Sequence, residues 1–172
     1  IVPTNSTTLA MAMGDALACA LMKARKFSKE DFAKFHPAGQ LGRNLLLTVA
    51  DVMTPAAECA VVSADDTIRK VVIEMTRKPL GAACAISADG TLEGLVTDGD
   101  VRRMLQNAVD LDSMKCSDIM TRKPVCAAAE DSLGQAVKLM EARKSKLSVL
   151  PVISEGGKFG GLVRLHDIYQ AQ

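Results

Sequence analysis

Hydrophobic positions between residues 9 and 25 follow a helical period. Leu, Met and Ala recur there at spacings of three and four, which predicts one helix with an apolar face. The preceding residues 3–8, PTNSTT, are rich in hydroxyl groups that commonly cap a helix. The apolar face carries few charges, and little in the rest of the sequence offers a surface large enough to cover it. We therefore expect this helix to pack against a further domain.

From residue 49 onward, short apolar strands alternate with amphipathic helices, and the whole series occurs twice. Each copy predicts a helical turn, a brief strand, a helix, two strands joined by a tight turn, and a final helix. These elements are expected at residues 49–53, 60–62, 67–77, 82–86, 92–97 and 98–106 in the first copy, and at 116–120, 125–127, 132–143, 147–153, 159–164 and 165–171 in the second. Asp66 and Asp131 are the expected caps of the longer helices.

The two copies align at a nearly constant spacing. Three matches lie 67 residues apart: GLV at 94–96 and 161–163, Asp100 and Asp167, and DVMT at 51–54 with DIMT at 118–121. Repeated sequence indicates a repeated fold, so we predict an α/β (α+β) architecture of two β-α-β-β-α units. In a pseudo-twofold arrangement the two units bury their sheet faces against each other and create two equivalent clefts.

The stretch GLVTDGDVRR at 94–103 predicts how each cleft is built. An apolar strand ends on Thr97, an acidic turn follows, and a helix begins. A strand that runs into a helix N-terminus presents free backbone N–H groups to an anion, but Asp98 or Asp100 can instead simply cap that helix. In the second copy Arg164 replaces the hydroxyl, and it can engage phosphate or lie on the surface.

Composition narrows the classes of function. The 172 residues are 48% hydrophobic and 24% charged, which suits one or two globular domains. A net charge of +1, with four Phe, one Tyr and no Trp, disfavours a nucleic-acid partner. The longest apolar stretch, residues 9–22, is interrupted and too short to span a membrane. Five cysteines without a CxxC predict buried, reduced thiols, no metal site and a cytoplasmic location.

The paired signature at 94–100 and 161–167 resembles the tandem CBS domain pair, or Bateman module, over residues 49–172. The resemblance divides this part into CBS domains at 49–106 and 116–172, joined by a linker at 107–115. It implies clefts that bind adenosine-type nucleotides, with the Thr97 hydroxyl on phosphate and the Asp100 carboxylate on the ribose diol. A carboxylate can accept two hydrogen bonds from a cis-diol. Arg164, His166 and Asp167 are the corresponding nucleotide-binding candidates, and His166 either stacks on a base or has no role.

Residues 1–48 are similar to the end of a sugar isomerase (SIS) domain, specifically that of bacterial arabinose 5-phosphate isomerases of the KdsD/KpsF type. PTNSTT at 3–8 and HPAGQLGR at 36–43 carry this resemblance, although Ala38 stands where that family usually has glycine. It implies that His36 is the catalytic histidine of the intact enzyme, and an imidazole suits proton transfer between aldose and ketose. The other catalytic groups would lie in an upstream SIS domain, so the 172 residues alone are expected to be inactive.

Two hypotheses of function follow. In the first, the CBS pair senses a nucleotide and regulates an isomerase that interconverts D-ribulose 5-phosphate and D-arabinose 5-phosphate for Kdo and lipopolysaccharide synthesis. The ligand is AMP or ATP by family analogy, or CMP-Kdo as a pathway end product; no cofactor is required. In the second, the pair only packs or dimerises, with empty clefts, and the substitution by Arg164 favours this. Both imply a homo-oligomer. A self-sufficient enzyme is disfavoured, because no phosphate-binding loop or metal cluster is present and the two histidines are far apart.

Overall fold

A computed structural model describes residues 4–28, 31–32, 47–106, 110–142, 145–154 and 156–171. The chain separates into two units, residues 1–46 and 47–172. His36 and its loop lie outside the described residues. Within the described residues, no helix has the length and apolar character needed to cross a membrane.

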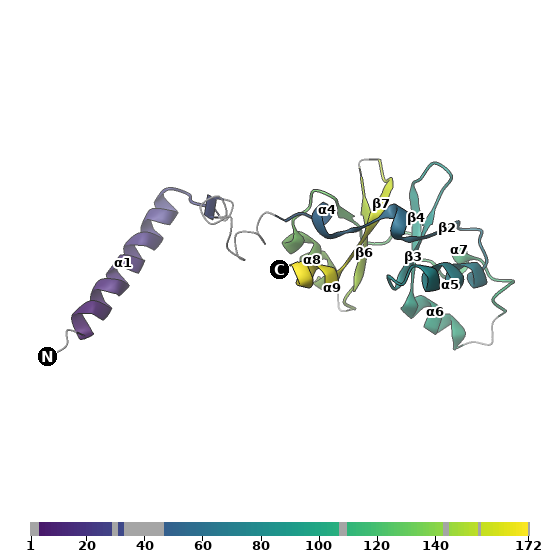
Figure 1. The fold of residues 1–172 in the computed structure, drawn as a ribbon, viewed down its shortest axis with the longest axis horizontal. Helices are drawn as coiled ribbons and strands as arrows, with labels where there is room; N and C mark the ends of the chain where they lie inside the picture. Colours follow the sequence, from purple (N-terminus) through teal and green to yellow (C-terminus); the bar gives the residue numbers. More distant parts are fainter. Residues whose placement is uncertain are drawn as a thin grey trace. The chain divides into compact units, whose positions relative to one another are not determined.

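The first unit contains α1 (Thr4–Ala24), drawn in purple in Figure 1. The helix begins earlier than predicted, since the hydroxyls of Thr7 and Thr8 bond back to the carbonyl of Thr4 as they do within a helical turn. No residue of α1 is buried, and Leu9 is 70% exposed. The expected packing of this apolar face against a further domain stays a prediction.

The second unit contains the two predicted copies (Figure 1). The first comprises α4 (Val49–Val52), β1 (Thr54–Pro55), the 3-10 helix η1 (Ala56–Glu58), β2 (Ala60–Val62), α5 (Ile68–Arg77), β3 (Ala82–Ile86), β4 (Leu92–Thr97) and α6 (Asp98–Leu105). The second comprises α7 (Cys116–Ile119), β5 (Ala127–Ala128), α8 (Leu133–Glu141), β6 (Val149–Ile153), β7 (Phe159–Arg164) and α9 (Leu165–Ala171). The predicted fold class, with its doubled α+β unit, is confirmed.

Several details of the prediction are wrong; the strand predicted at 147–153, for example, begins at Val149. Thr67 and Ser132 are the N-caps of α5 and α8, because the carboxylates of Asp66 and Asp131 are occupied one turn earlier. They accept the backbone N–H groups of Ser63 and Ala128, each at 2.8 Å. The first strand of the second copy is also shorter than predicted, since pairing with β6 starts only at Ala127.

Each copy contributes its leading segment to the sheet of the other copy. One sheet has the order β2-β3-β4 and the other β1-β7-β6-β5. In the second sheet β1, from the first copy, pairs antiparallel with β7. The equivalent crossing in the first sheet is a bridge between Leu95 and Thr121, with N–H···O distances of 3.0 and 2.8 Å. This reciprocity is the predicted pseudo-twofold relation.

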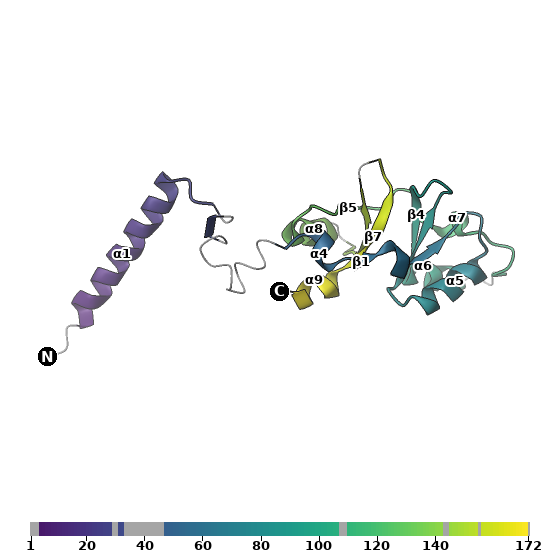
Figure 2. The same ribbon diagram turned by 45° about the horizontal axis from the view of Figure 1, so that its top comes forward.

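The leading segment of each copy also contributes to the hydrophobic core of the other copy. Val49 of α4 is buried in the core of the second copy, and Cys116 of α7 in that of the first. Figures 1 and 2 accordingly show α4 grouped with α8 and α9, and α7 with α5 and α6. A third cluster, which includes Leu95 and Leu162, lies between the two sheets. Because burial of apolar surface stabilises in proportion to its area, neither copy keeps its full core without the other.

All five cysteines are free. Cys59, Cys84 and Cys116 are buried and Cys126 is half-buried, and burial raises the pKa of the Cys59 and Cys116 thiols to about 11. Such thiols are unreactive at neutral pH. The prediction of burial is wrong for Cys19, which lies exposed on α1 because that helix has no covered face.

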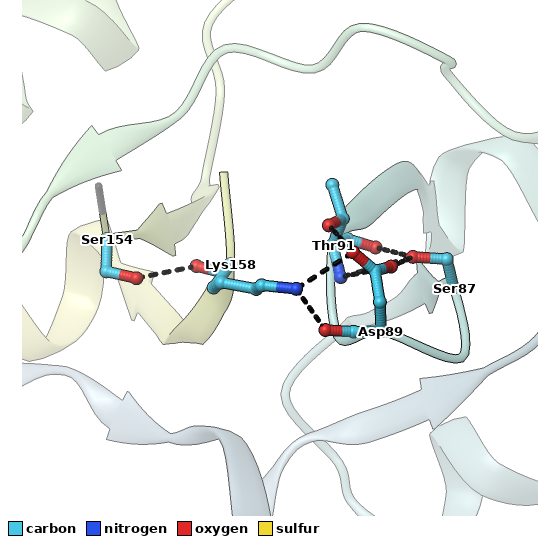
Figure 3. Close-up of polar contacts among 5 residues, drawn as sticks. All are labelled: Ser87, Asp89, Thr91, Ser154 and Lys158. Carbon is cyan, nitrogen blue, oxygen red and sulfur yellow. Dashed lines mark hydrogen bonds and ion pairs between the residues drawn. The ribbon is translucent and has the colours of Figure 1, made fainter. Parts of the chain in front are cut away.

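A polar contact joins the two hairpin tips on the pseudo-twofold axis. Thr91 and Lys158, which occupy equivalent positions in the two copies, form an antiparallel bridge. Figure 3 shows the Lys158 ammonium group reaching Asp89, whose carboxylate it contacts at 2.8 Å and whose carbonyl it also binds. The same carboxylate accepts the hydroxyls of Ser87 and Thr91. These contacts fix the hairpin of one copy to that of the other.

Because this contact depends on the charge of Asp89, we expect the stability of the fold to depend on pH. Hydrogen bonds from Lys158, Ser87 and Thr91 hold the pKa of Asp89 well below its usual range. A depressed folded-state pKa means that ionised Asp89 stabilises the fold above the unfolded value of about 3.9, and that this contribution declines as the pH falls below it. We expect Asp89→Asn to lower the midpoint of urea unfolding slightly at pH 7, because the carboxylate is 65% exposed.

The difference between Asp89→Asn and the unaltered chain should persist at pH 5 and shrink by pH 3. Asp65→Asn is a suitable control, since Asp65 forms a more exposed ion pair with Lys115 away from the hairpin tips. A difference for Asp89→Asn that stays constant from pH 7 to pH 3 would contradict the assigned role of its charge.

Candidate functional site

A cleft of about 410 Å³ lies between the two copies. The first copy lines it with Gly81, Leu95, Thr97, Asp98, Gly99, Asp100 and Arg103. The second copy contributes Thr121, Lys123, Pro124, Val125, Ser145, Lys146, Leu147, Ser148 and Val149. The volume is within the range of about 300–1,000 Å³ typical of small-molecule sites. The end of β4 and the start of α6 thus face a shared cavity.

Thr97 and Asp100, the two predicted contacts in the first copy, lie together at this cleft. Thr97 is the N-cap of α6, and its hydroxyl donates to Asp100 Oδ2 at 2.6 Å. The same oxygen accepts the backbone N–H of Thr97 at 2.8 Å, while Arg103 Nη2 lies 2.5 Å from Asp100 Oδ1. The two residues therefore form a capping box, which is the simpler of the two roles considered for Asp100.

Two backbone amides at the start of α6, those of Asp98 and Asp100, already have partners. The N–H of Asp98 donates to the carbonyl of Gly81 at 3.1 Å, and that of Asp100 donates to Thr97 Oγ1 at 3.4 Å. Asp98 itself is not the N-cap. A ligand at this end of the cleft would consequently meet fewer free N–H groups than the expected row.

In the second copy Arg164 and Asp167 are also brought together. Arg164 Nε and Nη2 donate to the two carboxylate oxygens of Asp167, both at 2.7 Å. This bidentate pair raises the pKa of the Arg164 guanidinium. The charge of Arg164 is thus paired with Asp167 three residues later, and a phosphate contact by Arg164 stays a prediction. His166 between them is exposed.

The glycines of the repeated signature leave space for the segments that cross from one copy to the other. A Cβ atom at Gly161 would lie 2.2 Å from the carbonyl oxygen of Thr54 in β1, and one at Gly94 would lie 2.5 Å from the Met120 sulfur. Each crossing chain therefore approaches a last strand where a side chain is missing. The signature that revealed the repeat owes its glycines to packing between the copies rather than to a ligand.

Arg103, Lys123 and Lys146 also line the cleft, and the sequence did not single them out. Lys123 and Lys146 lie in segments before β5 and β6, and only the pairing between copies places them beside Thr97. Alignment of the two copies could have marked these residues, because none of the three cations has a charged counterpart 67 residues away. No group of His, Cys, Asp or Glu in the described part of the chain has the arrangement of a metal site.

Comparison with known proteins assigns both copies to one type of domain. A family model described as "CBS domain" matches residues 49–107 and 116–172. The chain is 40% identical over 171 residues to arabinose 5-phosphate isomerase KdsD from Yersinia pestis, and 40% identical over 167 residues to KpsF from Escherichia coli. These alignments cover 99% and 97% of the chain but only 51% and 50% of the relatives. The chain thus spans about half the length of the curated relatives it matches.

Solved structures show the same fold. CBSX2, a CBS-pair protein from Arabidopsis thaliana, is similar in its complex with AMP, with a TM-score of 0.60 and 24% identity. The match covers 72% of this chain and 94% of CBSX2. At this identity the likeness shows a common fold for the doubled unit.

Proposed function

The chain belongs to the CBS domain family, and from this membership we propose that its doubled unit is the regulatory nucleotide-binding module of an arabinose 5-phosphate isomerase. The observation that carries the proposal is the placement of Thr97 and Asp100 at a cleft lined by both copies. A hydroxyl beside a carboxylate matches the needs of a phosphorylated ribose, because the carboxylate accepts from the sugar diol. The AMP bound by the structurally similar CBSX2 supports an adenine nucleotide as one ligand.

A ligand in this cleft would regulate the protein by changing how the two copies are arranged. It would contact α6 of the first copy and the segments before β5 and β6 of the second. A ligand that binds one relative arrangement of the copies more tightly than another shifts the population toward that arrangement. We propose that this shift is passed to the catalytic half present in the relatives, and that the chain works as part of a homo-oligomer in the cytoplasm.

We further propose that His36 acts in the catalytic site of the whole enzyme. The isomerase relatives align along nearly the entire chain, including this region, and an imidazole exchanges protons near neutral pH. The groups that complete such a site belong to the half of the relatives that this chain does not match. By itself the chain of 172 residues would then not isomerise D-arabinose 5-phosphate.

A second candidate function is packing alone. Arg164 with Asp167, and Thr97 with Asp100, satisfy each other within the chain. Side chains that are already paired stabilise helix ends whether or not a ligand binds. In this alternative the doubled unit joins subunits and its clefts stay empty.

Calorimetric titration of the chain with AMP, ATP, CMP and CMP-Kdo separates the two. We expect heat of binding and a rise in melting temperature for at least one of them, since a ligand that binds only the folded state raises its stability. Binding of AMP or ATP would indicate a purine-nucleotide sensor, and binding of CMP-Kdo would indicate an end-product sensor. The absence of binding for every nucleotide would overturn the sensing role and leave the packing role.

A further inference from the structure

The cleft at Thr97 is lined by cations that have no charged counterparts at the equivalent positions of the second copy. Its lining includes three cations, Arg103, Lys123 and Lys146. The residues 67 positions away are uncharged: Gln170, Ala56 and Pro79, respectively. The correspondence is fixed by the strands that follow Lys123 and Lys146, because β5 and β6 each start 67 residues after β2 and β3. The second copy has other cations instead, because Arg164 stands at the position of Thr97 and Lys78 at that of Ser145. Both have partners within the chain, since Arg164 binds Asp167 and Lys78 donates to the carbonyl of Ala57 at 3.2 Å.

Two of these cations are available to a ligand. Arg103 is bound to Asp100 at 2.5 Å. Lys146 lies 3.8 Å from Glu141, and its side chain is 73% exposed, so this pair is weak. Lys123 is exposed and forms no ion pair within the described ranges of the chain. The lysines thus bring two positive charges to a cleft whose lining has two carboxylates, that of Asp100, which is paired with Arg103, and that of Asp98.

In the second copy the cation at the position of Thr97 is already neutralised. Arg164 is its cation nearest the signature, and both of its hydrogen bonds to Asp167 are 2.7 Å long. Freeing that guanidinium for an anion would leave Asp167, whose side chain is only 17% exposed, without its partner. Loss of the partner of a shielded carboxylate is costly. The two halves consequently differ in what they can bind.

We propose that only the Thr97 cleft selects an anionic ligand, and that Lys123 and Lys146 set its preference for a ligand with two or more negative charges. This inference rests on the proposed nucleotide binding and specifies its ligand class, a nucleoside polyphosphate or a nucleotide with a second acidic group. The lysines contact the outer charges, while Thr97 and Asp100 hold the part that all nucleotides share. One ligand binds per chain.

The test uses two series of probes with the chain and its Lys123→Ala, Lys146→Ala and double variants. Adenosine, AMP, ADP and ATP vary the charge on one nucleoside, whereas inorganic phosphate and tripolyphosphate vary it without a base. We expect affinity to rise with charge in both series. Each lysine variant should weaken ATP and tripolyphosphate binding about threefold, and the double variant about tenfold, with adenosine unchanged.

Lys138→Ala is the matched control, because Lys138 is an exposed lysine of α8 that does not line the cleft. Equal affinity for AMP and ATP, unchanged ATP binding in the double variant, or two ligands per chain would overturn the inference. Tripolyphosphate that binds as tightly as ATP would contradict nucleotide recognition but leave charge selection intact. Absence of binding by every probe would overturn both proposals.

Discussion

Gly161→Ala is expected to destabilise the doubled unit by about 3 kcal/mol or more. The added Cβ would lie 2.2 Å from the carbonyl oxygen of Thr54 and 3.3 Å from the Pro55 Cα atom. Both neighbours are backbone atoms in a paired strand, with Pro55 opposite Gly161 in the register. They cannot rotate away as a side chain does. Accommodation therefore requires β1 to separate from β7, which breaks the crossing between the copies.

Urea unfolding of the variant measures this effect, and two other glycines calibrate it. Gly94→Ala should cost less, because its nearest neighbour is the flexible side chain of Met120. Gly134→Ala should raise stability by about 0.5 kcal/mol, since its Cβ meets nothing within 4 Å and alanine favours the helix. A Gly161→Ala variant within about 0.5 kcal/mol of the unaltered chain would contradict the packing role given to this glycine.

The hydrophobic periodicity predicted most accurately those elements whose ends are marked by turn residues or by a helix signal. The strands at 82–86, 92–97 and 159–164 and the helix at 165–171 match the structure residue for residue, because apolar runs there are bounded by turn residues or a helix signal. The exchange of leading segments could not be predicted. Val49 and Cys116 are simply apolar residues in short helical turns, and a local pattern does not tell which copy covers them.

The candidate site was predicted in part for a similar reason. Thr97 and Asp100 are three residues apart at a helix start, so their proximity follows from local geometry. Arg164 and Asp167 have the same spacing, and opposite charges at i and i+3 commonly pair, which the sequence could have indicated. Lys123 and Lys146 reach the cleft only through contacts between the copies, and no spacing within one copy reports such contacts.

Asp100→Asn is expected to weaken nucleotide binding at least tenfold, or by about 1.4 kcal/mol. An amide keeps the size of the carboxylate but replaces one acceptor oxygen by a donor, so it cannot accept both hydroxyls of a ribose diol. The loss of charge also weakens the hydrogen bonds from Thr97 and Arg103. Some stability, about 1 kcal/mol, should therefore be lost together with affinity.

Asp51→Asn separates these two effects. Asp51 accepts the backbone N–H and the hydroxyl of Thr48 at 2.8 Å each, which reproduces the capping box of Thr97 and Asp100 at the start of α4, outside the cleft lining. Both variants should unfold at lower urea concentration, and calorimetry should show weakened nucleotide binding for Asp100→Asn alone. If the two variants lose stability alike and bind nucleotide as tightly as the unaltered chain, Asp100 is only a helix cap, because the same chemistry at Asp51 performs that role without any ligand.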